Sequence, residues 1–141
     1  MRPRLATMAT ALWWGSLSGL GFVVVPMLFA NLGSPAIAGA MAAKLFSAQT
    51  WVSVACAMLV LMASSRKDDP AMAMASRTLM KWVIAGLFLA VLVEFGVSPR
   101  IANARLEGGN LKLWHALGTA MYIGQWLCAG WALWISSRRT D

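Results

Sequence analysis

Charged side chains are scarce in this chain. Among its 141 residues are 12 Lys or Arg, five Asp or Glu, and a single His. So few carboxylates and imidazoles leave little material for acid–base chemistry, and no familiar catalytic motif occurs, so we do not expect an enzyme. The two cysteines, Cys56 and Cys128, lie inside apolar stretches, which excludes the disulfide framework of a small secreted domain.

Long apolar runs fill the space between the charges. Apolar residues make up 60% of the chain, and its mean hydropathy is +0.67. Because a helix needs roughly 20 mostly apolar residues to cross a bilayer, the four runs predict an all-α fold, a four-transmembrane-helix bundle. The expected spans are about 7–29, 44–64, 80–97 and 112–135, within a single integral membrane domain, 1–141. Membrane lipids are therefore the expected surroundings.

The basic residues predict the orientation of the spans. The net charge of +7 would suggest a nucleic-acid partner in a soluble protein, but here the basic residues flank apolar runs, and we expect no nucleic acid. The amino end, the 66–81 connection and the carboxyl end together hold eight Lys or Arg, against four on the opposite side. Since cytoplasmic loops are enriched in positive charge, both termini are expected in the cytoplasm of a bacterial-type inner (plasma) membrane.

Prolines and capping residues predict where the helices begin and end. Pro26 removes a backbone donor near the outer end of the first span and should disturb the helix there. Ser34 followed by Pro35 is typical of a helix start, and Pro99 repeats the pattern, so short outer helical segments are expected after Pro35 and Pro99. Asn110 should cap the last helix. Each half thus has a span, a proline, a short outer segment and a second span, as in a parallel repeat.

Glu94 is the carboxylate that stands inside an apolar run, where an ionisable group is costly and marks a functional site or an internal partner. The structural alternative is an ion pair with an outer basic residue such as Arg100, Lys112 or Lys44. Polar residues from three helices map to the same outer third of the membrane. If they face inward, they form a polar vestibule that binds or passes a small solute, lipid or ion; if they face outward, they are ordinary interface residues. The residues expected to line the vestibule are Gln49, Glu94, Arg100, His115, Lys44 and Asn103.

Two other functions remain open from the residues alone. His115, the sole imidazole, cannot by itself supply both axial ligands of a haem or the three ligands of catalytic zinc, so no cofactor is the first expectation. A haem- or copper-binding protein would need His115 from two copies, or His115 with a methionine. An accessory or assembly subunit would use Gly15 and Gly19, whose spacing lets helices approach in lipid, to contact a second copy or another membrane protein. Gln125, deep in the last run, is expected to form a hydrogen bond to another helix.

Four motifs follow one another in a recognisable order: Gly21–Phe29, Ala43–Ser47, Ser98–Arg100 and Trp114–Gly118. Together they resemble the transmembrane protein 205-like family, whose bacterial members share a domain of unknown function. The resemblance implies a four-helix integral membrane protein and no particular activity. The positions that match the family pattern are Pro26, Lys44, Phe46, Pro99, Arg100 and His115.

Overall fold

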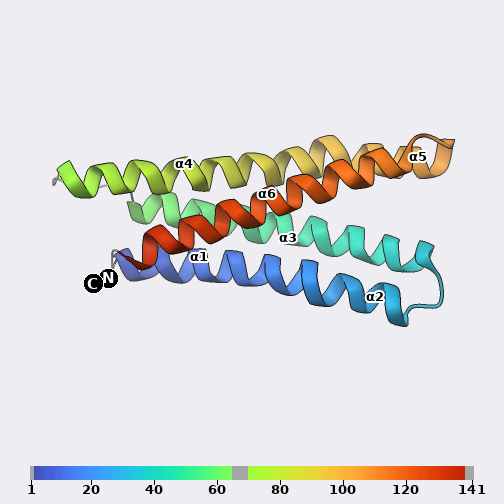
Figure 1. The fold of residues 1–141 in the computed structure, drawn as a ribbon, viewed down its shortest axis with the longest axis horizontal. Coiled ribbons are helices and arrows are strands. Elements are labelled where there is room, and N and C mark those ends of the chain that lie inside the picture. The colour runs from blue at the N-terminus through green and yellow to red at the C-terminus, as the bar shows by residue number, and fades with distance from the viewer. Residues whose placement is uncertain (1, 65–69, 139–141) are drawn as a thin grey trace.

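The computed structural model describes residues 2–64 and 70–138, and the side chains of 4–64 and 74–138. These residues form α-helices interrupted by two turns of π-helix (η), and no strand occurs among them. The elements are α1 (Arg2–Gly19), η1 (Leu20–Val24), α2 (Val25–Asn31), α3 (Pro35–Ser64), α4 (Pro70–Leu92), η2 (Val93–Val97), α5 (Ser98–Glu107) and α6 (Leu111–Ser137). The elements α1, η1 and α2 follow one another without a gap, as do α4, η2 and α5, so the described residues make four long rods (Figure 1).

The four rods lie side by side in one elongated bundle. The start of α1 and the end of α6 lie at the same end of it, called here the termini end (Figure 1). The opposite end, called the loop end, carries the connections 32–34 and 108–110. The closest packing joins α1 to α3 and α4 to α6, and further contacts between α1 and α6 and between α3 and α4 complete the bundle.

Three stretches are long and apolar enough to cross a membrane: Arg4–Asn31, Pro35–Ser64 and Met74–Glu107. The fourth rod, α6, has 27 residues but is not among them. It carries Tyr122, Gln125 and several tryptophans, which lower its mean hydropathy. The expectation of a membrane protein is therefore supported, whereas the fourth span and the orientation of the termini stay predictions.

Close packing inside the bundle depends on small residues around one large ring. The indole of Trp13 is fully buried, and it packs with alanines and aliphatic side chains from α1, α3, α4 and α6. A Cβ added at Gly86 would lie only 2.8 Å from Cη2 of Trp13. Real Cβ atoms do not approach that closely, so the glycine on α4 is what gives the indole its space.

Each π turn stands directly before a proline. The turn η1 begins at Leu20, six residues before Pro26, and η2 begins at Val93, six residues before Pro99. A proline in a helix lacks the N–H group and collides with the carbonyl four residues earlier, and a wider turn relieves that collision. The disturbance expected at Pro26 is therefore a π turn, and the second half of the chain repeats it.

The helix ends follow the local capping signals. The backbone N–H three residues after Ser34 donates to its hydroxyl at 3.3 Å, and Asn110 accepts in the same way at 3.1 Å. Gly108 ends α5 in the left-handed conformation with a φ of 79°, which suits glycine. The segments expected after Pro35 and Pro99 are helical, but they are continuous with their spans: Pro35 opens α3, and Pro99 lies in the rod that begins with α4.

Candidate functional site

Hydrogen bonds between side chains tie three rods together inside the bundle. Gln49 is 8% exposed, and its Nε2 donates to Ser16 Oγ at 2.9 Å. Gln125 is 4% exposed and donates from Nε2 to Ser53 Oγ at 2.9 Å, while Ser53 donates to the backbone carbonyl of Gln49 at 2.9 Å. The hydrogen bond expected from Gln125 to another helix is confirmed. These groups satisfy one another, so the network holds α1, α3 and α6 in register.

Tyr122 of α6 inserts its hydroxyl into the backbone of the first rod. The hydroxyl donates to the carbonyl of Leu17 at 2.7 Å. A Cβ at Gly21 would lie 2.7 Å from Cε1 of Tyr122, so glycine is needed there. The edge of the Tyr122 ring also meets the ring of Phe46, with centroids 5.1 Å apart. Tyr122 was not expected at a site from the sequence, although Gly21, five residues before Pro26, marks the place where its ring approaches the first rod.

Glu94 lies in η2 and is half-buried. The hydroxyl of Ser47, on α3, donates to Glu94 Oε1 at 2.6 Å, which is the short distance typical of a hydroxyl bound to a carboxylate. Within the described part of the chain, no basic side chain lies at ion-pair distance from this carboxylate. In the described residues, Glu94 therefore does not form the alternative ion pair with Arg100, Lys112 or Lys44. Ser47 was not expected as a partner.

Arg100 of α5 is engaged elsewhere. Its Nη1 donates to the carbonyl of Gly96 at 2.6 Å, one helical turn earlier in the same rod. Its guanidinium carbon lies 5.2 Å from the ring centroid of Trp114, at the start of α6, a distance that allows a cation–π interaction. The guanidinium is thus held on the surface of the loop end, and it does not neutralise Glu94.

The six residues expected in a vestibule separate into two groups. Gln49 is buried and Glu94 is half-buried, whereas the other four, Lys44, Arg100, Asn103 and His115, are exposed. Only Gln49 and Glu94 therefore meet the requirement of facing inward. His115 stays a predicted ligand, and in the described part of the chain no group of three or more His, Cys, Asp or Glu side chains is positioned to hold a metal ion.

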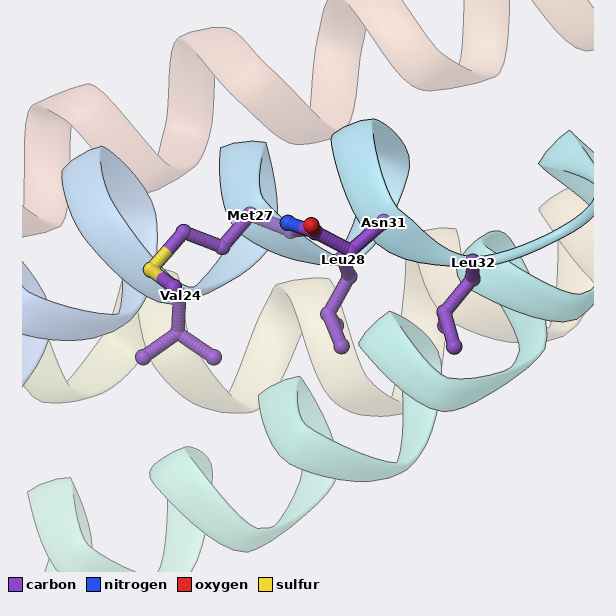
Figure 2. A pocket seen from close by; sticks show the side chains of 5 residues that line it. All are labelled: Val24, Met27, Leu28, Asn31 and Leu32. Carbon is purple, nitrogen blue, oxygen red and sulfur yellow. The ribbon is translucent and has the colours of Figure 1, made fainter.

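An open apolar groove of about 410 Å³ runs along the loop-end half of the first rod. It is lined by Val24, Met27, Leu28, Asn31 and Leu32, and Figure 2 shows Leu28 and Leu32 reaching from this rod toward α3. Asn31 is its single polar lining residue, and its Nδ2 donates to the carbonyl of Met27 at 2.8 Å. Since Glu94 does not line the groove, the two features are separate.

Comparison with known proteins gives one match. A family model described as "Domain of unknown function (DUF4149)" matches residues 8–110, which are 103 of the 141 residues. No curated protein and no solved structure matches the chain. The matched region contains Ser47 and Glu94 and stops before α6, so His115 lies outside it. The match to a domain of unknown function agrees with part of the expected resemblance, whereas the transmembrane protein 205-like name stays a prediction.

Proposed function

The chain belongs to the DUF4149 family, whose domain has no known function, and we propose that it binds a small polar solute or ion at Glu94 and passes it through the membrane bundle. The observation that carries this proposal is the bond from Ser47 to a half-buried carboxylate inside an apolar rod. A carboxylate in a membrane segment is costly, and such groups mark substrate and ion pathways by default. If the residue served only the fold, Gln or Leu at this position would avoid the free-energy cost of placing a carboxylate in the membrane.

The position of Glu94 in the backbone supports the same proposal. It stands in a π turn, and π turns inside α-helices are frequent at functional sites. The proline six residues after the start of that turn leaves a backbone carbonyl without its usual helical donor, which adds local polarity. Glu94 and Ser47 are therefore the residues we assign to the site.

The membrane topology is part of the proposal. We assign α6 as the fourth span, because it packs against both α1 and α4 along the bundle. With both termini in the cytoplasm, the loop end faces outward, and Glu94 lies in the outer half of the bilayer. Lys44, Arg100, Asn103 and His115 then form an exposed polar rim that a solute meets first.

The test is a stability screen with a matched variant. The melting temperatures of the purified parent protein and of Glu94→Gln are measured with a panel of ions and small polar solutes. The control is Glu107→Gln, because the carboxylate of Glu107 is exposed at the end of α5. At a concentration of about 100 times the dissociation constant, a bound solute stabilises the fold by about 2.7 kcal/mol, enough for a clear shift. We expect a solute that stabilises the parent and Glu107→Gln but not Glu94→Gln. If every solute changes the melting temperatures of all three proteins equally, a site at Glu94 is refuted.

A second function is favoured by the outer surface of α1. Among the described residues, a Cβ added at Gly15 or at Gly19 would meet no atom within 4 Å, so neither glycine packs against another rod described here. Small residues four apart allow close approach of another helix in lipid, as an accessory subunit would need. Because no described residue occupies that space, Gly15→Leu should leave the bundle folded and abolish only an association with another protein. Retained association in co-purification from membranes would exclude this role for the pair.

A further inference from the structure

The charge around Glu94 indicates the charge of its ligand. The carboxylate has a hydroxyl partner and, among the described residues, no basic one at ion-pair distance. Arg100, six residues further along the same rod, is tied to a backbone carbonyl and to the Trp114 ring. A half-buried carboxylate in a membrane is stabilised by a positive charge brought next to it. The ligand charge that this carboxylate favours is therefore positive.

The number of ligand atoms limits which cation. Glu94 contributes one carboxylate and Ser47 one hydroxyl, and in the described part of the chain no group of three or more acidic, histidine or cysteine side chains is positioned to hold a metal ion. Calcium takes six to eight oxygen ligands, and magnesium demands an octahedral set. One carboxylate and one hydroxyl are far short of either requirement. They are, however, sufficient for a monovalent organic cation, whose charge needs a counter-ion and no coordination shell.

The surroundings indicate an apolar body on that cation. Large apolar side chains stand exposed on the same rod before and after Glu94: Val91 is 38%, Leu92 41% and Phe95 66% exposed. A ligand that reaches Glu94 from the bilayer therefore approaches along a rod with exposed apolar side chains. Quaternary ammonium and similar cations are also attracted to aromatic rings, and Phe95, the next residue along the rod, exposes one to the bilayer.

We propose that Glu94 is the counter-ion of a lipophilic monovalent organic cation, such as a quaternary ammonium or phosphonium ion, which enters sideways from the bilayer. This inference rests on the proposed function and specifies its ligand class. The hydroxyl of Ser47 holds the carboxylate toward α3 in the empty site and stays bonded to one oxygen when the cation approaches the other. The apolar substituents of the ligand lie against the exposed face of the rod.

The experiment compares two probes of equal shape and opposite charge. Binding of tetraphenylphosphonium and of tetraphenylborate is measured by equilibrium dialysis against the protein in lipid nanodiscs, with empty nanodiscs subtracted. The proteins are the parent chain, Glu94→Gln, Ser47→Ala and the control Glu107→Gln. We expect saturable binding of the phosphonium alone, weakened at least tenfold in Glu94→Gln, about fivefold in Ser47→Ala and less than twofold in Glu107→Gln. Retained melting temperatures show that each variant is folded.

The outcomes separate this inference from the proposed function. Equal binding of phosphonium and borate, or undiminished phosphonium binding by Glu94→Gln, overturns the inference, because the probe then merely partitions into lipid. If the phosphonium does not bind, but another solute of the stability panel still stabilises the parent and not Glu94→Gln, the ligand class is wrong and the site at Glu94 stands. If no solute distinguishes the two proteins, both statements are wrong.

Discussion

At Gly21 a single added methyl group is expected to disturb the packing of the bundle. In Gly21→Ala the new Cβ would lie 2.7 Å from Cε1 of Tyr122, about 0.7 Å inside the 3.4 Å at which ordinary contact begins. The ring cannot simply retreat, because its hydroxyl is bonded to Leu17 and its edge meets Phe46. Either the hydrogen bond or the helix spacing must give way.

The expected loss of stability can be estimated from these contacts. Overpacking a close-packed core costs about 1–3 kcal/mol, and a side-chain hydrogen bond inside a membrane protein is worth about 0.6 kcal/mol, with a maximum near 1.7. Replacing glycine by alanine in a helix returns about 1 kcal/mol. We therefore expect Gly21→Ala to lower the free energy of unfolding by about 2 kcal/mol. Gly15→Ala on the same rod, where no atom lies within 4 Å, should be neutral or stabilising by up to about 1 kcal/mol.

The assay is an unfolding titration in mixed detergent micelles, followed by circular dichroism at low protein concentration. Each glycine variant is measured alone and in a Tyr122→Ala background. The cost of Gly21→Ala should largely disappear when the ring is absent, whereas Gly15→Ala should behave the same in both backgrounds. The reasoning is refuted if the two alanine variants are equally stable, or if Gly21→Ala costs as much without the Tyr122 ring as with it.

Two further predictions concern the interior of the bundle. Gly86→Ala would place a Cβ 2.8 Å from the fully buried ring of Trp13, so the same titration should show a loss of about 1–3 kcal/mol, and an unchanged value would contradict the packing described for this indole. Gln125→Leu removes the hydrogen bond to Ser53, whereas Ser53 keeps its own bond to a backbone carbonyl. The free energy of unfolding should fall by about 1 kcal/mol. A loss above about 3 kcal/mol would mean that the network does more than align the helices.

Local signals made the helix ends predictable. Ser34 and Asn110 were expected to cap helices, and both accept a backbone hydrogen bond, because capping depends on residues within one turn of the chain. A disturbance at Pro26 was also expected. That it takes the form of a π turn was not, although the collision of the proline with an earlier carbonyl accounts for it. The bond from the Tyr122 hydroxyl to Leu17, 105 residues away in the sequence, was not expected either. No local pattern reports such a contact.

The sequence was sufficient to predict Glu94 as a site residue, but it was not sufficient to predict which side chain bonds to it. Glu94 stood out because a carboxylate is rare in an apolar run. The partners that electrostatics suggested were basic residues, yet the structure gives the hydroxyl of Ser47. A serine in an apolar run is commonplace, and whether it meets a carboxylate depends on which helix faces pack together. The same dependence explains why Lys44 and His115, at a similar expected depth, turn out to be exposed.

The most direct test of a ligand site at Glu94 is its reaction with a lipophilic carbodiimide in native membranes, read by mass spectrometry of the modified peptides. Such a reagent reaches carboxyl groups from the lipid, so we predict an adduct at Glu94 that fades when tetraphenylphosphonium or a stabilising solute from the melting screen is present. Labelling of Glu107, exposed at the end of α5, should not respond to the solute. An adduct at Glu94 that no such solute protects, or labelling of Glu107 alone, would contradict a ligand site at Glu94.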